Sequence, residues 1–571
     1  MLVAMAEIAH RGGSVSEAVG ELGAGREALA SCSVDDRIRL IDRLTADTHA
    51  AAKEWVAVSC AAKGIDPASP TASEEWLAGP VSVLRNLGLL RRSLAHLARH
   101  RRPLLADSEL ELRDGTTVAR VFPEVLSDRL VLTGFSAEIW MEAGVSPENV
   151  RDTMARVYLD PAGVEPGICA VLGAGNVSSI GPQDVLQKLF AENRVCALKL
   201  NPVNEYLGPI FERAFAAAVD AGFLRILEGG AETGAELVHH DEVCEVHITG
   251  SQTVHDAIVW GPPEVREANR TAGTPVLDKP ITSELGCVTP FILVPGQWTR
   301  RELAFQAANV ATMLTNNASF NCNAAKVLVT SAGWPQREAF LAELGRALER
   351  IPPRLAYYPG ADGRHERFIS DHPGSVSYGE RGEGRLPWAV APGVDPTAED
   401  VTAFGIEAWC GVLAETALPS EDAVEFLPAA VRFCNERLYG TLSCGLAADP
   451  RTRARPEVAA AVATALRELR YGSIGVNHWP ALSYAMGVTT WGAYPGHTIE
   501  DVQSGIGFVH NTRLFGRPHK SVVEGPFCAP ILPLWFAGHR RALPAAEALA
   551  RYEARPGLGR LLAVARHALR P

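Results

Sequence analysis

Gly167-Ile-Cys-Ala-Val-Leu-Gly-Ala-Gly175-Asn-Val-Ser178 begins the part of the chain whose pattern decides the fold. Its apolar run is typical of a buried strand, and the glycines after it are typical of a turn. From here to Trp260, segments with strand character alternate with segments of helical periodicity. Strands joined through helices pair in parallel, which predicts a doubly wound α/β sheet with ligands at the carboxyl ends of its strands. The expected strands are Ile168–Leu172, Val195–Lys199, Leu224–Leu227 and Glu245–Ile248, and the expected helices are Gln183–Glu192, Leu207–Ala221, Glu232–His239 and Thr253–Trp260.

Two turns in this region have the form of phosphate-binding turns. Gly173-Ala-Gly175 is half of a dinucleotide-binding fingerprint, but it lacks the last glycine and is weak evidence alone. Thr249-Gly250-Ser251 precedes an expected helix, whose free N–H groups could hold a phosphate. A plain capping turn explains the second turn equally well.

The composition is that of a globular protein with enough mass for more than one domain. The chain has 571 residues, of which 47% are hydrophobic and 21% are charged. Its net charge of −12 leaves no basic surplus to neutralise phosphates, which argues against nucleic acid or an anionic membrane and favours a small metabolite. Eleven cysteines without metal-ligand spacing predict a reducing, cytoplasmic location and no metal site. Met1–His10 lacks the pattern of a signal peptide, and no apolar run is long enough to span a membrane.

The segments that flank the alternating region have other patterns. Ser14 to about Arg102 is Ala- and Leu-rich with helical spacing, which predicts a helical cover. Arg113–Val121 and Asp128–Leu132 show short β-like alternation, as an extended arm or an oligomer-forming hairpin would. Near the end of the chain, Leu561–Leu569 is expected to form an amphipathic docking helix.

Cys322 lies between the polar, turn-like segment that starts at Thr315 and a β-branched run, where a loop would present a thiol just before a strand. It could instead be a small buried hydrophobe, as most cysteines are. Glu284, at the foot of a glycine-containing turn, could be the general base for water attacking a thioester on Cys322, or an ordinary surface acid. The two together favour nucleophilic catalysis.

Several motifs, in order along the chain, resemble those of the aldehyde dehydrogenase superfamily. The resemblance covers roughly Ile38 to Phe515 and implies two doubly wound α/β domains, one for NAD or NADP and one for the nucleophile, with a small oligomerisation arm. The motifs are Gly229–Val243 running into Val246–Ser251, Glu284-Leu-Gly286, the loop around Cys322, Phe404–Val412 and Tyr471–Asn477.

The resemblance also implies roles for single residues. Cys322 would be the nucleophile, Glu284 the general base, and the Asn176 amide a donor to the oxyanion. Lys199 and Glu407 would reach the ribose hydroxyls of the cofactor. The full set of expected cofactor contacts is Lys199, Gly230, Gly234, Gly250, Ser251, Leu285 and Glu407.

Four departures from the family pattern stand out. Asn176 follows a glycine where the family has an aromatic residue, and Ser319-Phe320 replaces the usual Gly-Gln pair before the cysteine. Pro202 stands where NAD-preferring members place a glutamate, so the choice between NAD and NADP stays open. His255 replaces a second glycine of the phosphate turn.

The implied reaction is oxidation of an aldehyde to a carboxylic acid with NAD(P) through a cysteine thioester, in a homodimer or homotetramer. An acyl-CoA or acyl-carrier reductase, or an acylating aldehyde dehydrogenase, would use the same cysteine, and a non-catalytic relative could act as a binding protein. The expected domains are a helical cover (1–112), a Rossmann-like NAD(P)-binding domain with an arm near 113–160 (113–285), a catalytic domain (286–475), a return segment closing the pocket (476–518) and a C-terminal extension (519–571).

Overall fold

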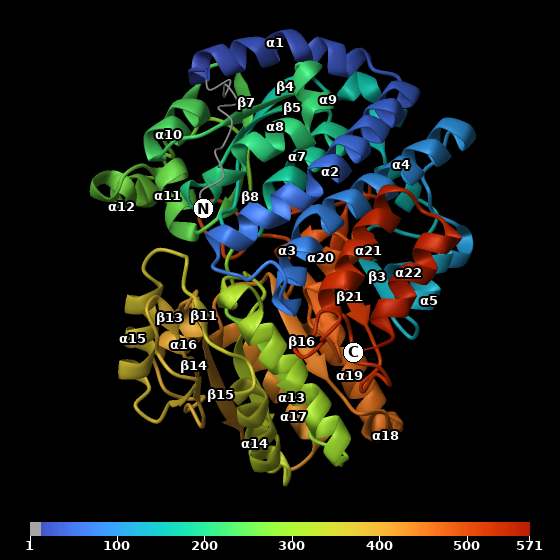
Figure 1. Cartoon of the computed structure of the whole chain (residues 1–571). Helices are drawn as coiled ribbons and strands as arrows, with labels where there is room; N and C mark the ends of the chain where they lie inside the picture. Colours follow the sequence, from blue (N-terminus) through green and yellow to red (C-terminus); the bar gives the residue numbers. More distant parts are fainter. Residues whose placement is uncertain (1–12, 571) are drawn as a thin grey trace.

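The computed structural model describes residues 13–570 and has two α/β halves, each built on its own sheet (Figure 1). In Figure 1 the smaller sheet lies in the upper half and the larger sheet in the lower half. The signal-peptide expectation for Met1–His10 falls outside the described residues. Within them, no helix is both long and apolar enough to cross a membrane.

The smaller sheet has six strands in the order β19-β8-β7-β4-β5-β6, all parallel except β19. Its centre is the predicted alternating region, whose strands and helices are confirmed with small shifts of their ends. The expected helix over 207–221 is broken into two at Phe215. The elements are β4 (Gly167–Leu172), α7 (Ile180–Ala191), β5 (Arg194–Lys199), α8 (Gly208–Ala214), α9 (Ala216–Asp220), β6 (Leu224–Leu227), α10 (Ala231–His239), β7 (Val243–Gly250), α11 (Gln252–Trp260), α12 (Pro263–Ala272), β8 (Ile281–Leu285) and β19 (Gly505–Ile506).

The predicted helical cover is also confirmed. α1 (Val15–Ser31) packs on β4, β5 and β6, while α2 (Val34–Ala62) packs on α8 and α9. Both helices begin with a capping box, in which a serine and an acidic residue three positions later satisfy the free N–H groups. α4 (Ser82–His100) lies beside α2 and leads toward the larger sheet.

The larger sheet has eleven strands in the order β1-β2-β3-β21-β17-β16-β9-β10-β15-β14-β12. The strands from β21 to β14 are parallel, and antiparallel strands close both edges. Buried apolar clusters line both of its faces, one with α13 and α14, the other with α17 and α19. The elements are β1 (Leu110–Arg113), β2 (Thr116–Phe122), β3 (Ser136–Met141), β9 (Thr289–Leu293), α13 (Arg300–Thr315), β10 (Ala325–Ser331), α14 (Arg337–Glu349), β12 (Val376–Tyr378), β14 (Trp388–Ala391), β15 (Val412–Leu418), α17 (Ala423–Arg437), β16 (Ser443–Ala447), α19 (Pro456–Glu468), β17 (Ser473–Val476) and β21 (Pro518–Glu524).

Two expectations about residues 113–160 need correction. The strand predicted at Asp128–Leu132 is wrong, since the helix α5 (Leu126–Val131) occupies this segment. The Asp128 carboxylate accepts the N–H groups of Glu124 and Val125, which closes the start of a helix. In addition, the domain boundary at 113 assigned these strands to the cofactor half, whereas β3 pairs with β21 in the larger sheet. A role in oligomerisation stays a prediction.

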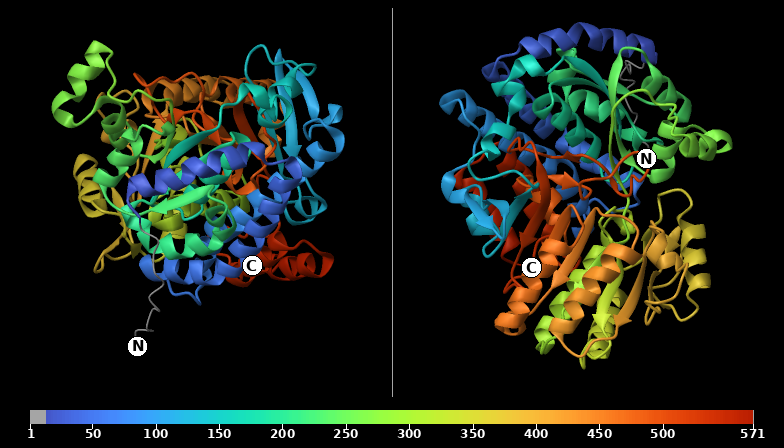
Figure 2. Two further views of the ribbon diagram at one scale, coloured as in Figure 1. Left: turned by 90° about the horizontal axis from the view of Figure 1, so that it is seen from above. Right: turned by 180° about the vertical axis from the view of Figure 1, so that it is seen from behind.

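The chain ends in two helices that lie against the N-terminal helices, although they come from opposite ends of the sequence (Figure 2). α21 (Ala542–Ala554) contacts α4 and the short helix α3 (Ser73–Trp76), and α22 (Leu558–Ala568) contacts α5. The helix predicted at Leu561–Leu569 is therefore confirmed. The remaining short elements are α6 (Arg156–Leu159), β11 (Arg354–Leu355), α15 (Ala361–Asp371), β13 (Arg385–Leu386), α16 (Thr402–Gly405), α18 (Pro450–Arg453), α20 (Leu482–Met486), β18 (Trp491–Gly492) and β20 (Phe508–Val509).

Candidate functional site

Cys322 lies in a loop between the short helix η7 (Asn316–Ser319) and β10, as the sequence predicted. The three residues Asn317, Ala318 and Ser319 have φ angles of 51°, 54° and 71°. This left-handed conformation costs a non-glycine residue roughly 1–2 kcal/mol, so other contacts must hold the loop in place.

The Asn317 side chain supplies many of those contacts. Its amide group donates to the backbone oxygens of Asn176 and Phe320, each at 3.1 Å. Its carbonyl oxygen accepts from the Lys63 ammonium at 3.0 Å and from the Tyr357 hydroxyl at 2.9 Å. Every hydrogen-bonding capacity of this side chain is used, which fixes the turn before Cys322.

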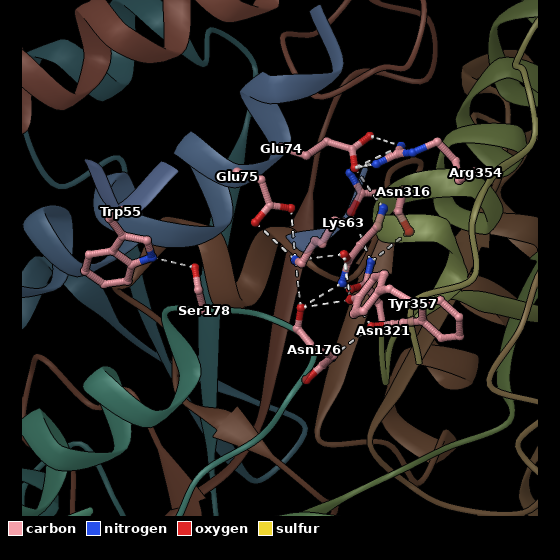
Figure 3. Close-up of polar contacts among 12 residues, drawn as sticks. Trp55, Lys63, Glu74, Glu75, Asn176, Ser178, Asn316, Asn321, Arg354 and Tyr357 are labelled. Atoms are coloured by element: carbon pink, nitrogen blue, oxygen red, sulfur yellow. Dashed lines mark hydrogen bonds and ion pairs between the residues drawn. The ribbon is translucent and has the colours of Figure 1, made fainter. Parts of the chain in front are cut away.

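Lys63, the residue directly after α2, connects the two halves of the site (Figure 3). Its ammonium bonds both Glu75 carboxylate oxygens, at 2.9 and 3.1 Å, and also the backbone oxygen of Asn176 at 3.0 Å. Both charged side chains are almost fully buried. Beside them, Glu74 pairs with Arg354 and accepts the Asn317 backbone N–H. The helical cover is therefore part of the support of the cysteine loop.

The Cys322 thiol donates to Glu284 Oε1 across 3.3 Å. Glu284 is the second-to-last residue of β8 in the smaller sheet, so the two halves meet at this contact. Burial raises the pKa of Glu284 to about 7. Burial also raises the pKa of Cys322 well above its usual range, and the nearby Glu284 carboxylate raises it further. Glu284 Oε2 has no partner among the described residues. Near neutral pH, Glu284 can thus accept a proton, and the thiol keeps its own proton until it reacts.

Asn176 lies just after β4, in the turn that faces the cysteine loop. One hydrogen of its amide is donated to the backbone oxygen of Phe320 at 2.9 Å. An amide nitrogen carries two hydrogens, so a second donor remains for a ligand in the cavity that Asn176 lines. Its expected role as an oxyanion donor is compatible with this geometry.

The expected cofactor residues lie at the carboxyl ends of neighbouring parallel strands. Lys199 ends β5, Gly250 ends β7, and Ser251 caps α11 by accepting the Val254 N–H at 3.3 Å. The chain places β5 and β7 on opposite sides of β4, which makes this edge a topological switch point, where ligands of such sheets bind. Gly230 precedes α10, and Gly234 lies within that helix.

Two ionisable side chains at this edge are affected by burial. Burial lowers the pKa of Lys199, and it raises the pKa of the Glu407 carboxyl against the attraction of Lys326. The Glu407 Oε1 atom is buried and has no hydrogen-bond partner among the described residues. Glu407 packs on Gly286, next to Leu285, so closely that a Cβ at this glycine would collide with its carboxylate. Unpaired buried polar atoms are costly, and a ligand rich in hydroxyls, such as a nucleotide ribose, suits them.

A cavity of about 320 Å³ opens in front of the thiol and carboxylate. Cys322, Glu284 and Asn176 line it together, and Trp479 and Trp491 form part of its aromatic wall. Trp479 also donates to the backbone oxygen of Asn323 at 2.8 Å, which holds the residue after the nucleophile. The volume lies within the range of small-molecule sites.

Sequence reasoning missed the supporting residues Lys63, Asn317 and Tyr357. Asn317 is part of the polar run noted before Cys322, and this run was the available signal for it. Lys63 is 254 positions from its partner Asn317, and no local pattern indicates such a contact.

Comparisons with known proteins support the fold. No protein-family model matches this chain. Among solved structures, a glyceraldehyde-3-phosphate dehydrogenase from Methanocaldococcus jannaschii complexed with NADP has a TM-score of 0.58 at 14% identity, covering 89% of this chain and 93% of its own. An aldehyde dehydrogenase from Pseudomonas syringae, complexed with NAD+ and octanal, has a TM-score of 0.58 at 15% identity, covering 91% and 90%. A gamma-glutamyl-gamma-aminobutyraldehyde dehydrogenase from Burkholderia cenocepacia has a TM-score of 0.59 at 18% identity, covering 89% and 88%. This chain has the same two-sheet fold.

Proposed function

We propose that this protein, which has the fold of aldehyde dehydrogenases, oxidises an aldehyde to a carboxylic acid with NAD or NADP through a thioester on Cys322. The observation that carries the proposal is the 3.3 Å contact between the Cys322 thiol and Glu284 on the wall of one cavity. A nucleophile and a base with a pKa of about 7 are the two groups that such chemistry needs at neutral pH.

In the first step, the Cys322 sulfur bonds to the aldehyde carbon, and the thiol proton is released to solvent water, which leaves the Glu284 carboxylate free to act later. The carbonyl oxygen becomes an oxyanion, for which the free Asn176 amide hydrogen and the Cys322 backbone N–H are candidate donors. A bound nicotinamide cofactor supplies the acceptor for the hydride that leaves the same carbon. The carbon then remains attached to sulfur as a thioester.

In the second step, Glu284 removes a proton from water while the water oxygen attacks the thioester carbon. The carbon–sulfur bond breaks, the acid leaves and the thiol forms again. Burial suits Glu284 to this work, since a carboxyl with a pKa of about 7 both gains and loses a proton readily near neutral pH. Water is the favoured acceptor because a thiol acceptor has no need of this carboxylate.

The cofactor proposal rests on the switch-point edge of the smaller sheet. Lys199 ends β5 at this edge, and Glu407 has a buried oxygen, unpaired among the described residues, that suits a ribose hydroxyl. Ser251 caps a helix whose free N–H groups suit a phosphate. Similar folds from M. jannaschii and P. syringae were solved with NADP and NAD+, respectively. Both cofactors are therefore candidates for this chain.

The test is NAD(P)H formation by the purified protein with a panel of aldehydes, with and without coenzyme A. Cys322→Ser should lower turnover by at least ~10³-fold and leave cofactor binding intact, because a hydroxyl is a far weaker nucleophile here. Cys528→Ser, a half-buried cysteine that does not line the cavity, is the matched control and should keep full activity. Near-normal turnover of Cys322→Ser would remove this residue from the mechanism.

A further inference from the structure

The cavity that holds Cys322 has a wall made by the end of the chain. Residues 525–570, here the C-terminal segment, follow the last strand of the larger sheet. Eleven of their residues line the cavity, from α21, α22 and the loop before them, and eight of these are apolar. The apolar residues are Leu534, Trp535, Phe536, Ala537, Ala542, Leu549, Leu561 and Val564, and the polar ones are His539, Tyr552 and Glu553.

A second part of the lining comes from the other end of the chain and mixes apolar with polar side chains. Leu77, Ala78 and Val81 are its apolar residues from the segment before α4, and Val131 is one from α5. Leu77 and Val81 belong to the same packed apolar cluster as Leu549 of α21, and the cavity that they line reaches Cys322 and Glu284. A ligand with its reactive carbon at the sulfur can thus extend along apolar side chains from both ends of the chain.

The charged side chains that line this cavity are largely neutralised by one another. Arg85 pairs with Asp128 at 3.1 Å and with Glu553 at 3.4 Å, and all three are largely buried. Arg354 pairs with Glu74 at 3.2 Å, and the other lining arginine, Arg350, is exposed. Among the described lining residues, no buried cation is left to bind a carboxylate or phosphate. The lining favours an uncharged ligand.

We infer that the substrate is an aldehyde with a long, uncharged apolar chain, and that the C-terminal segment is the wall that selects it. This inference rests on the proposed function of Cys322 and names the class of aldehyde. The substrate chain buries its methylene groups against the apolar side chains that the C-terminal segment and the segment before α4 present to the cavity. Each methylene group buried in this way strengthens binding by roughly threefold to fourfold.

The C-terminal segment is fixed to the body of the protein, as a specificity wall must be. Glu553 from α21 bonds Arg85 of α4, whose Nε donates to the backbone oxygen of Met486 at 2.6 Å. The Ala537 N–H donates to the Thr312 hydroxyl of α13 at 3.1 Å. These contacts attach the segment to two separate elements, α4 and α13, so its shape is part of the folded site.

The test uses straight-chain aldehydes of two to twelve carbons with the full-length protein. We expect kcat/KM to rise with chain length until the cavity is filled. Leu561→Trp narrows the apolar wall and should lower kcat/KM for decanal by at least ~10-fold while acetaldehyde changes less than about twofold. Leu562→Trp, one position on, is the matched control, because Leu562 is 61% exposed and does not line the cavity. Leu549→Phe probes the same wall from α21 if Leu561→Trp does not fold.

A second readout separates this inference from the proposed function. Saturated alcohols from ethanol to decanol should protect Cys322 from alkylation increasingly with length, measured by mass spectrometry of its peptide, and Leu561→Trp should remove the advantage of decanol. Protection of this kind without turnover on any aldehyde supports the apolar wall and overturns the proposed oxidation. A chain-length profile that is flat in both readouts, or equal effects of Leu561→Trp and Leu562→Trp, overturns the wall.

Discussion

Replacing Glu284 by glutamine should change the pH dependence of folding stability. Glu284 is 2% exposed, and burial raises its pKa from 4.5 to about 7. Because the folded-state pKa is above the unfolded one, the fold favours the protonated carboxyl. The free energy of unfolding of the wild type therefore falls as the pH rises from about 4.5 to about 7, because over this range the unfolded chain releases this proton and the folded chain does not.

The size of the penalty follows from the two pKa values. At ~1.4 kcal/mol per pH unit, the difference between 4.5 and about 7 corresponds to roughly 3 kcal/mol once both states are ionised. Glutamine has nearly the same shape and does not titrate. The free energy of unfolding of Glu284→Gln, minus that of the wild type, should therefore be about 2–3 kcal/mol larger at pH 8 than at pH 5.

Equilibrium urea unfolding of both proteins at the two pH values measures this difference. Glu399→Gln is the control, because this exposed glutamate lies outside the cavity. Infrared spectra provide a direct check: the wild-type spectrum minus that of Glu284→Gln should contain the carbonyl band of a protonated acid at pH 6 and lose most of it by pH 8. The subtraction removes the band of Glu407, whose pKa burial also raises. A stability difference that is the same at both pH values would falsify the argument that burial keeps Glu284 protonated.

Two further predictions concern the chemistry and the support of the site. Glu284→Gln should release NAD(P)H in a burst close to one per active site and then turn over slowly, because the base is needed only after the thioester forms. A variant without the burst would mean that Glu284 activates Cys322 or only supports the fold. Lys63→Met should lower the free energy of unfolding, measured by urea unfolding, by roughly 3–5 kcal/mol, because it leaves the Glu75 carboxylate buried without its partner. The double variant with Glu75→Gln should recover part of this loss. A loss below ~1 kcal/mol in Lys63→Met would show that the pair is not held as Figure 3 draws it.

The sequence predicted those features that local patterns carry. The alternation between residues 167 and 260 depends on periodicity within each segment, and the structure reproduces it nearly element by element. The position of Cys322 before β10 followed from a polar run next to β-branched residues. Both depend only on residues that are close in the chain.

The features that were missed have two causes, a local cap that opposes a strand-like pattern and contacts between residues far apart in the chain. Asp128–Leu132 has the alternation of a strand, but the Asp128 side chain caps a helix start, and such a cap outweighs a short pattern. The contact of Lys63 with Asn317, and that of the C-terminal segment with the catalytic cavity, join parts of the chain hundreds of positions apart. Periodicity carries no information about such pairs.

The pairing of β3 with β21 has a consequence for how the protein is made. The ribosome completes β3 at Met141, but its partner strand begins only at Pro518. At a synthesis rate of about 5–20 residues per second, the β3 edge waits roughly 20–75 s for β21. During that time an unpaired strand edge is exposed, which invites pairing with another nascent chain. A chaperone that covers this edge until β21 has been synthesised would prevent such pairing.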